Sequence, residues 1–286
     1  MSWRNLAAIL AAAFLSVISL PSAAQILYGA TGGLNGGVAT GNLYILDQTT
    51  GAASVVGPIG YSVTGMAFQN GIMYGATTNN AACSSCLIRI NLYTGAGTVI
   101  GPLGLTISEL EFGPGGKLFG WSESSDEFAS INLTTGAATT IPGSGISTYG
   151  DGLAFLAGTM YVMPQGANST YYSVNTTTGA VTPLGTLTGN PLPAGAAVNA
   201  AAVQPGTSAV FASVNDFGAA SNLVTVNLFN GVITNVGTTV TGLDALSFGP
   251  AAGIPTLSQW SLLGLMLLVG FVGMRGSRGL AQVPRA

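Results

Sequence analysis

The chain has 286 residues, of which 48% are hydrophobic and only 5% are charged, and it contains no histidine. The absence of histidine excludes Ser-His-Asp and Cys-His catalytic arrangements. Nine acidic and two basic side chains lie between residues 25 and 253, a net charge of −7, which excludes ordinary nucleic-acid binding and disfavours docking on anionic lipid head groups.

Residues 1–24 have the pattern of a secretory signal peptide. Arg4 supplies a positive charge, residues 6–20 form an apolar segment, and small residues just before Gln25 predict cleavage there. A membrane-spanning anchor is the alternative, but the apolar run is short and ends at Pro21. We therefore expect an N-terminal signal helix that signal peptidase removes on export.

A five-residue unit, with Asp or Asn four positions before Gly, recurs five times in the body of the chain. Its copies begin at Asp47, Asn91, Asn132, Asn175 and Asn227 and end at Gly51, Gly95, Gly136, Gly179 and Gly231. The Asx side chain can accept a hydrogen bond from the backbone two residues on, and Gly can adopt the left-handed conformation that closes a hairpin turn. A row of metal ligands is the alternative, but turn chemistry already explains the spacing.

Four short strand-like runs accompany each turn, and the glycines lie 44, 41, 43 and 52 residues apart, as in the blades of a propeller. The first unit begins with its second strand, at residues 26–29, whereas the missing first strand is found at residues 243–248. This offset predicts an all-β domain over residues 25–250, a five-bladed propeller of four-stranded blades. The C-terminal strand would complete the first blade and close the ring.

Cys83 and Cys86 are the two cysteines of the chain. In an oxidising periplasm, a pair at this spacing favours a local disulfide. A redox-active pair would need a helix N-terminus in a thioredoxin-like context, and zinc would need two further cysteine or histidine ligands, which the sequence lacks.

One position in each first strand, four residues before its aromatic or apolar end, carries a side-chain oxygen. These positions are Thr64, Ser108, Asp151, Asn199 and Asp244. If the first strands line the channel, the five side chains form a ring at one mouth that would suit a hard cation such as Ca²⁺, with Asp151 and Asp244 as its acidic metal ligands. The alternative is that they are strand-entry residues that bond to loop backbone groups. No other cofactor is expected.

The chain changes character at Ala251, where the predicted C-terminal segment, residues 251–286, begins. An apolar run at 261–274 follows an aromatic residue at 260, and a basic end occupies 275–286. Residues 254–274 would span about 31 Å as a helix, enough to cross a membrane, and the arginines mark the cytoplasmic side.

This tail resembles the C-terminal sorting signals of exosortase-processed bacterial proteins, of the type named for its Ile-Pro-Thr-Leu motif. The resemblance rests on the apolar span, the basic end and the motif residues Ile254, Pro255, Thr256, Leu257 and Trp260. It implies an exported protein of a Gram-negative bacterium whose tail holds it in the inner membrane. An exosortase-type enzyme then cuts the tail, and the body reaches the cell surface or the extracellular matrix. The repeated body resembles bacterial surface repeat propellers.

We therefore predict a non-enzymatic cell-surface propeller, a binding or structural module with an extracellular polysaccharide or another surface ligand as its partner. The alternative is a secreted carbohydrate-active enzyme, a glycosidase or a lyase, that uses channel carboxylates. Such an enzyme would need two acids on opposite sides of one bond. The acids to compare are Asp151, Asp244, Glu109 and Glu111.

Overall fold

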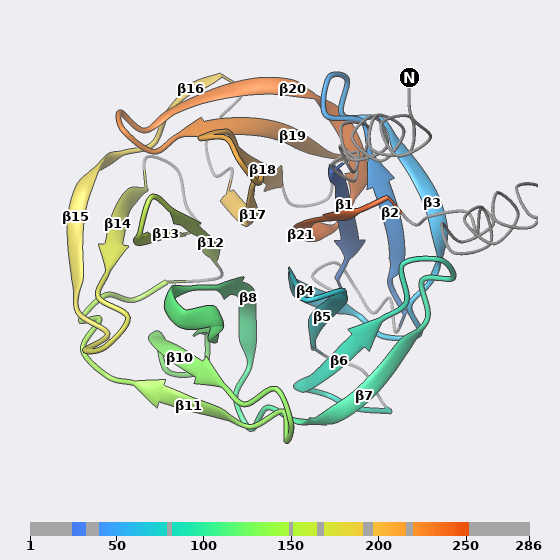
Figure 1. Cartoon of the computed structure of the whole chain (residues 1–286). Coiled ribbons are helices and arrows are strands. Elements are labelled where there is room, and N and C mark those ends of the chain that lie inside the picture. Colours follow the sequence, from blue (N-terminus) through green and yellow to red (C-terminus); the bar gives the residue numbers. More distant parts are fainter. Residues whose placement is uncertain are drawn as a thin grey trace, which may run out of the picture. The chain divides into compact units, whose positions relative to one another are not determined.

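The computed structural model describes residues 25–32, 40–78, 82–148, 151–164, 169–190, 197–215 and 220–251. The chain divides into two compact units, residues 1–251 and 252–286. In the described part of the first unit, five sheets, antiparallel apart from one short strand, surround a central axis (Figure 1), so the predicted five-bladed propeller is confirmed. The predicted signal helix, transmembrane helix and sorting motif lie outside the described residues. Within the described ranges, no helix is long and apolar enough to cross a membrane.

Each blade is built from four strands in antiparallel order from the channel outwards. The first blade comprises β21 (Leu243–Pro250), β1 (Gln25–Thr31), β2 (Asn42–Leu46) and β3 (Ala53–Pro58). The second comprises β4 (Val63–Gln69), β5 (Ile72–Thr77), β6 (Cys86–Ile90) and β7 (Gly97–Pro102). The third comprises β8 (Ile107–Phe112), β9 (Leu118–Ser122), β10 (Glu127–Ile131) and β11 (Ala138–Ile141), with a 3₁₀ turn η1 (Pro114–Gly116) after β8.

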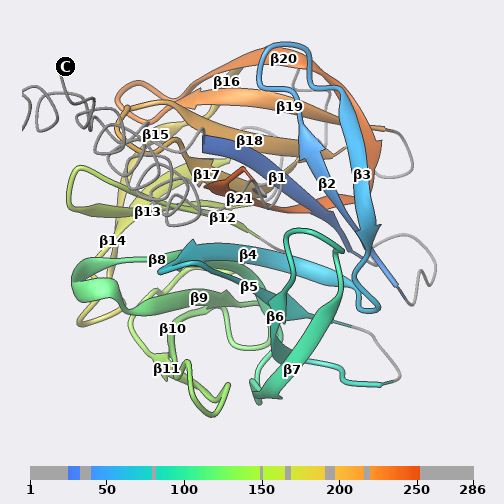
Figure 2. The same ribbon diagram turned by 45° about the vertical axis from the view of Figure 1, so that its right-hand side comes forward.

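The last two blades follow the same order, but the fifth has one additional strand. The fourth blade comprises β12 (Asp151–Leu156), β13 (Thr159–Pro164), β14 (Thr170–Val174) and β15 (Val181–Thr186). The fifth comprises β17 (Ala197–Val203), β18 (Val210–Asn215), β19 (Ala220–Asn227) and β20 (Val232–Thr241). The short β16 (Thr188–Asn190) runs parallel to β20 and lies along its outer side (Figure 2). It therefore covers an edge that would otherwise expose unpaired backbone groups.

Ring closure occurs as the sequence predicts. Strand β21 pairs antiparallel with β1 along its whole length, from Gln25 opposite Pro250 to Ala30 opposite Ala245. The Tyr28 hydroxyl also donates a 2.9 Å hydrogen bond to the Pro250 carbonyl. The two ends of the propeller domain are therefore joined in one sheet.

The repeated five-residue unit is the hairpin turn between the two outer strands of each blade. In the second blade, Asn91 Oδ1 accepts hydrogen bonds from the backbone N–H groups of Tyr93 at 2.8 Å and Thr94 at 3.2 Å. Gly95 closes the turn with a φ of 80°. The predicted turn chemistry is confirmed, because the Asx oxygen is occupied by backbone donors rather than left for a metal.

The turn glycines also make the joints between blades at the rim. A Cβ atom built on Gly95 would overlap the carbonyl of Gly57 on β3, and one built on Gly57 would overlap the carbonyl of Thr94. The same close approach recurs at every interface, where each turn packs on the outer strand of the preceding blade. The other pairs are Gly136 on Gly101, Gly179 on Ile141, Gly231 on Thr186 and Gly51 on Gly237.

Each of the five interfaces between neighbouring blades has its own hydrophobic cluster. Between the third and fourth blades, for example, Trp121 is fully buried, and the rings of Phe119 and Phe128 stack at 4.9 Å. The core of this domain is therefore a ring of separate clusters around the channel, to which the innermost strands also contribute side chains.

Candidate ligand-binding site at one end of the channel

The innermost strands β4, β8, β12, β17 and β21 form a closed ring, in which each contacts the next (Figure 1). The predicted oxygen ring lies near the beginning of these strands. Phenylalanine side chains lie near the end of four of them. The two ends of the channel are therefore chemically different.

At the oxygen end, four of the five predicted residues occupy β-bulges. On β4, Val63 pairs with Thr77 and Gly65 with Ala76, which leaves Thr64 as the extra residue. Ser108, Asn199 and Asp244 are extra residues in the same way. A bulge places an unpaired residue in a strand and redirects its side chain, which explains why a polar residue recurs at this position.

The bulge side chains are buried and bond mainly to the protein itself. Thr64 donates a 2.7 Å hydrogen bond to the Ile107 carbonyl on the next blade, and Ser108 donates one of 3.4 Å to the Trp121 carbonyl. The structure also brings Asn199 and Asp244 together, since the Asn199 amide donates to Asp244 Oδ1 at 3.4 Å.

The fifth member of the predicted ring, Asp151, begins β12 opposite Pro164, and its side chain is outside what the structure describes. Among the described residues, no group of three or more His, Cys, Asp or Glu side chains is placed to hold a metal ion. Thr64 and Ser108 bond to carbonyls of strands rather than to the loop backbone groups of the strand-entry interpretation. That interpretation and the cation site at Asp151 and Asp244 both stay predictions.

Glu109, on β8, occupies the interior of the channel. One carboxyl oxygen accepts hydrogen bonds from the N–H groups of Leu110 at 2.8 Å and Met66 at 3.3 Å, and the other accepts one from Ala201 at 3.2 Å. These partners lie on three blades, and those of Glu109 and Ala201 are not neighbours in the ring. The side chain, which has no exposed surface, therefore bridges the channel.

Burial raises the pKa of Glu109 well above its ordinary value, and the nearby Glu111 adds to this rise. The three backbone N–H groups oppose it, because they stabilise the charged form. Burial therefore favours the protonated form of Glu109, although both carboxyl oxygens accept hydrogen bonds from backbone N–H groups.

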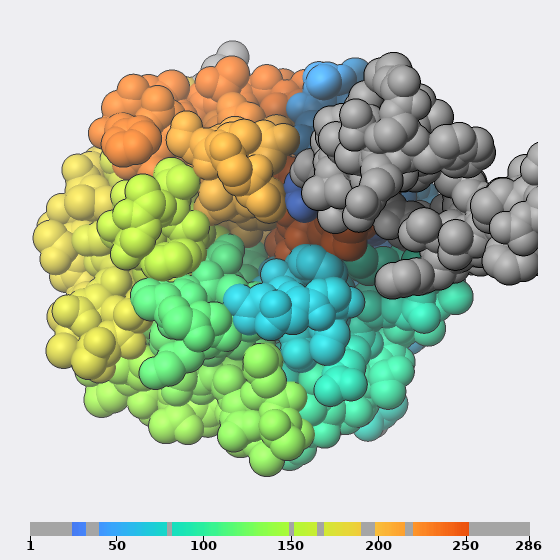
Figure 3. Space-filling view, viewed as in Figure 1, coloured from blue at the N-terminus to red at the C-terminus, as the bar shows by residue number. Residues whose placement is uncertain are grey.

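The ends of all five inner strands enclose a pocket of about 340 Å³ on the opposite face. Its aromatic wall consists of Phe68, Phe112, Phe155 and Phe248, and the remaining lining residues are Ala67, Glu111, Leu156, Ala202, Val203, Gln204, Pro205, Gly206, Thr207, Leu246 and Ser247. We call this the phenylalanine pocket. Figure 3 shows the blue-green, green and orange segments that meet around the channel axis on this face.

Glu111 is the one ionisable side chain among the residues that line the phenylalanine pocket. It lies two residues beyond Glu109 on β8, so both carboxyl groups project to the same side of the strand. Burial raises the pKa of Glu111 to about 8, and the N–H group of Phe112 partly opposes the shift. Glu111 is therefore mostly protonated at neutral pH, although part of its surface is accessible.

Two of the phenylalanine rings that line the pocket pack on further rings. Phe112 packs edge to face on Tyr74, and Phe248 packs edge to face on Phe211, each with ring centroids 5.8 Å apart. The wall is therefore built into the blade interfaces rather than carried on loops.

Sequence reasoning used the phenylalanines only to align the strands and did not predict the phenylalanine pocket. The available signal was the repetition of Phe at the ends of four inner strands. A second signal was the pair Glu109 and Glu111 at positions where the equivalent strands carry small uncharged residues.

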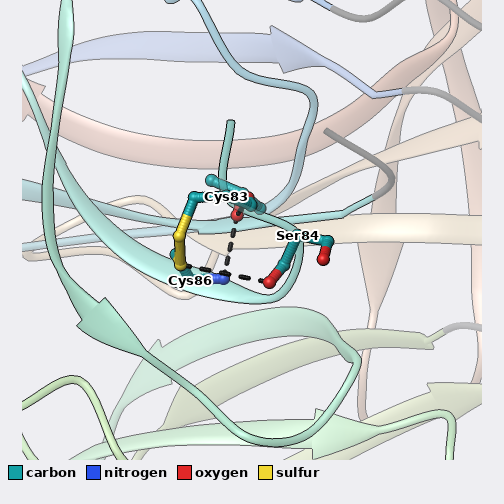
Figure 4. The surroundings of a disulfide bond; sticks show 4 residues. Cys83, Ser84 and Cys86 are labelled. Carbon is teal, nitrogen blue, oxygen red and sulfur yellow. Dashed lines mark hydrogen bonds between the residues drawn. A yellow bond between two sulfur atoms is a disulfide. The ribbon is translucent and has the colours of Figure 1, made fainter. Parts of the chain in front are cut away.

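The structure joins Cys83 and Cys86 through a disulfide at the edge of the second blade, with Cα atoms 5.9 Å apart (Figure 4). The Thr77 hydroxyl donates to the Cys83 carbonyl at 2.8 Å and accepts from the Cys86 N–H at 2.9 Å. The oxidised state in the exported protein stays a prediction, which mass spectrometry of alkylated protein can test.

A family match covers the tail of the chain, and solved structures resemble the fold of its body. The IPTL-CTERM motif matches residues 252–279. The crystal structure of a nidogen/laminin complex contains a similar chain, with 13% identity and a TM-score of 0.50 over 79% of this chain and 98% of that one. At this identity the likeness concerns the fold alone.

Two bacterial proteins of unknown function are also similar. One, from Bacteroides caccae, has 12% identity and a TM-score of 0.46 over 78% of this chain and 98% of that one. The other, from Bacteroides thetaiotaomicron, has 15% identity and a TM-score of 0.44 over 60% of this chain and 50% of that one. No curated protein matches the chain by sequence.

Proposed function

We propose that this protein, a five-bladed propeller with an IPTL-CTERM tail, is an exported cell-surface module that binds a small extracellular ligand in the phenylalanine pocket without catalysing a reaction on it. The observation that carries the proposal is the pocket itself. All five blades contribute to its lining, and two of its four phenylalanine rings pack edge to face on further rings. Ligand sites in proteins are typically concave and combine apolar side chains with a few polar groups, and this pocket places phenylalanine side chains beside Glu111, Gln204 and Thr207.

The signal peptide pattern and the C-terminal sorting signal support a location at the cell surface. Signal peptidase removes residues 1–24, and the apolar residues 261–274 hold the precursor in the inner membrane of a Gram-negative cell. An exosortase-type enzyme processes the tail, and the body becomes a surface or matrix protein. The IPTL-CTERM match at residues 252–279 supports this route.

The distribution of carboxyl groups favours binding over glycoside hydrolysis. A glycosidase needs two carboxyl groups that flank the scissile bond. Glu111 is the single acid in the lining of the pocket, and Glu109 is fully buried with its oxygens occupied by three backbone donors. A second acid that could reach the same bond is thus missing from the lining.

The proposal is tested with the full chain in detergent micelles, screened against a glycan array and a library of small metabolites. The variant Thr207→Trp places a large ring at the exposed rim of the pocket, whereas Ser208→Trp places the same ring one residue outside the lining. We expect binding of at least one ligand that Thr207→Trp weakens at least tenfold and Ser208→Trp leaves unchanged.

Mass spectrometry of the bound ligand distinguishes a binder from an enzyme. Recovery of intact ligand supports the proposal, and accumulation of cleaved product would establish the carbohydrate-active enzyme instead. Equal binding by wild type and Thr207→Trp would show that the phenylalanine pocket is not the site.

A further inference from the structure

We infer that the phenylalanine pocket takes an organic ammonium ion, with Glu111 as its carboxylate partner and the faces of the phenylalanine rings around its alkyl groups. This inference rests on the proposed binding function and names the class of ligand. Aromatic faces attract cations through their quadrupole, and the attraction is stronger where water is excluded. The pocket combines four such rings with a single acid.

The charges of the domain exclude an anionic ligand and favour a cationic one. Residues 25–253 carry a net charge of −7, and no lysine or arginine lines the pocket. A phosphate or carboxylate ligand would meet no counter-charge there. A cation would be attracted by the domain as a whole before it reaches Glu111.

The composition of the lining also separates an organic cation from a metal ion. A hard cation such as Ca²⁺ requires six to eight oxygen ligands in general. The pocket offers one carboxylate beside four phenylalanine rings, which suits a weakly hydrated cation that carries its own apolar surface. Its volume of about 340 Å³ lies at the small end of the range for ligand pockets, as expected for a head group the size of choline.

Binding of such a cation would change the protonation of Glu111. In the free pocket the carboxyl group is largely protonated at pH 7, so formation of the ion pair releases its proton to solvent. A quaternary ammonium ion does not titrate itself. Its affinity should therefore rise about tenfold per pH unit up to the pKa of Glu111 and level off above it.

We assign the pH dependence of cation affinity to Glu111 because it is the ionisable group that lines the pocket. The inner strands β4 and β17, which also contribute to the pocket lining, contain no ionisable side chain. The nearby charges are Glu109 on the same strand, Lys117 just before β9, Asp151 at the start of β12 and Asp244 on β21. Both aspartates lie at the oxygen end of the channel, away from the pocket.

The test compares choline with its neutral isostere 3,3-dimethyl-1-butanol by calorimetry on the full chain in detergent. We expect choline to bind and the isostere to bind at least tenfold more weakly. Between pH 6 and 7, choline affinity should rise about tenfold, and titrations in phosphate and Tris buffers should show release of close to one proton. Equal binding of the two compounds would overturn the inference without any variant.

Glu111→Gln keeps the shape of the side chain and removes its charge. We expect it to lower choline affinity at pH 8 at least tenfold and to abolish proton release, whereas Glu123→Gln, outside the pocket, leaves both unchanged. A pH-independent affinity in the wild type would contradict the inference. If choline fails to bind but another ligand binds and is blocked by Thr207→Trp, the ammonium inference fails and the binding function stands. If no ligand is blocked by Thr207→Trp, the binding function fails as well.

Discussion

The Glu109 carboxylate accepts a 3.2 Å hydrogen bond from the backbone N–H of Ala201, on a blade that is not its neighbour. Most contacts in a propeller join adjacent blades, so this bond acts across the ring. It makes one side chain a common partner of three inner strands.

The first prediction is that Glu109→Gln destabilises the propeller by about 1–3 kcal/mol, the usual cost of a buried polar group left without a partner. The variant keeps one acceptor oxygen and turns an amide N–H₂ toward a backbone donor. Calorimetry should show a lower melting temperature, by about 2–4 °C per kcal/mol for a domain of this size. Glu123→Gln is the matched control, and equal melting of both variants would contradict the bridging role.

The second prediction concerns pH. Because the pKa of Glu111 is raised to about 8 in the folded protein, the folded state holds more protons than the unfolded state above pH 4.5. The free energy of unfolding should therefore fall as pH rises from about 4.5 to 8, by on the order of 1 kcal/mol per unit at most. Denaturant unfolding at pH 5, 6, 7 and 8 measures this slope.

The contribution of Glu111 to that slope can be separated from that of Glu109, whose pKa is also raised by burial. Glu111→Gln should reduce the slope and leave the parts due to Glu109 and Glu123, whose pKa values burial also raises, and the opposing part due to Asp47, whose pKa is lowered by hydrogen bonds. A variant with the wild-type slope would show that Glu111 is not the titrating group.

The third prediction tests the rim joints. Gly57→Ala should destabilise the domain by about 1–3 kcal/mol, because the added methyl group meets the backbone carbonyl of Thr94 on the next blade. Gly185 occupies the equivalent place in the fourth blade, but there the nearest atom to an added Cβ is 3.4 Å away in the Tyr171 ring. Gly185→Ala should therefore be tolerated, and similar melting of the two variants would argue against the joint.

The fourth prediction decides between the cation-site and the structural interpretation of the predicted oxygen ring. If Asp151 and Asp244 hold a cation, millimolar Ca²⁺ should raise the melting temperature through preferential binding to the folded state. The double variant Asp151→Asn with Asp244→Asn should then lose this gain. No response in the wild type, or an equal response in the variant, would leave the bulge residues with a structural role alone.

The parts of the fold that the sequence predicts are those set by local spacing. The Asx-to-Gly turns recur at regular spacing, so the blade count could be inferred. The first unit begins with its second strand at residues 26–29, so the ring closure could be inferred as well. The extra strand β16 could not, because its three residues have no pattern that distinguishes them from a loop.

The candidate site was harder to predict because it depends on contacts between distant strands. Nothing near Glu109 in the sequence indicates that its oxygens will meet the N–H groups of Met66 and Ala201. The bulges at Thr64 and its equivalents also redirect side chains in a way that simple alternation does not foresee. The sequence pattern identifies the residues of the oxygen ring, but only the structure shows the hydrogen bonds that their buried side chains make.

The position of the closing strand sets a limit on where the tail can be cut. Strand β21 ends at Pro250, and the matched sorting motif begins at residue 252. A protease that cuts within or after the motif would release a complete ring, whereas one that cuts before β21 would strip β1 of its partner and open the first blade. During synthesis, likewise, the ring stays incomplete until β21, the last strand of the body, has been made.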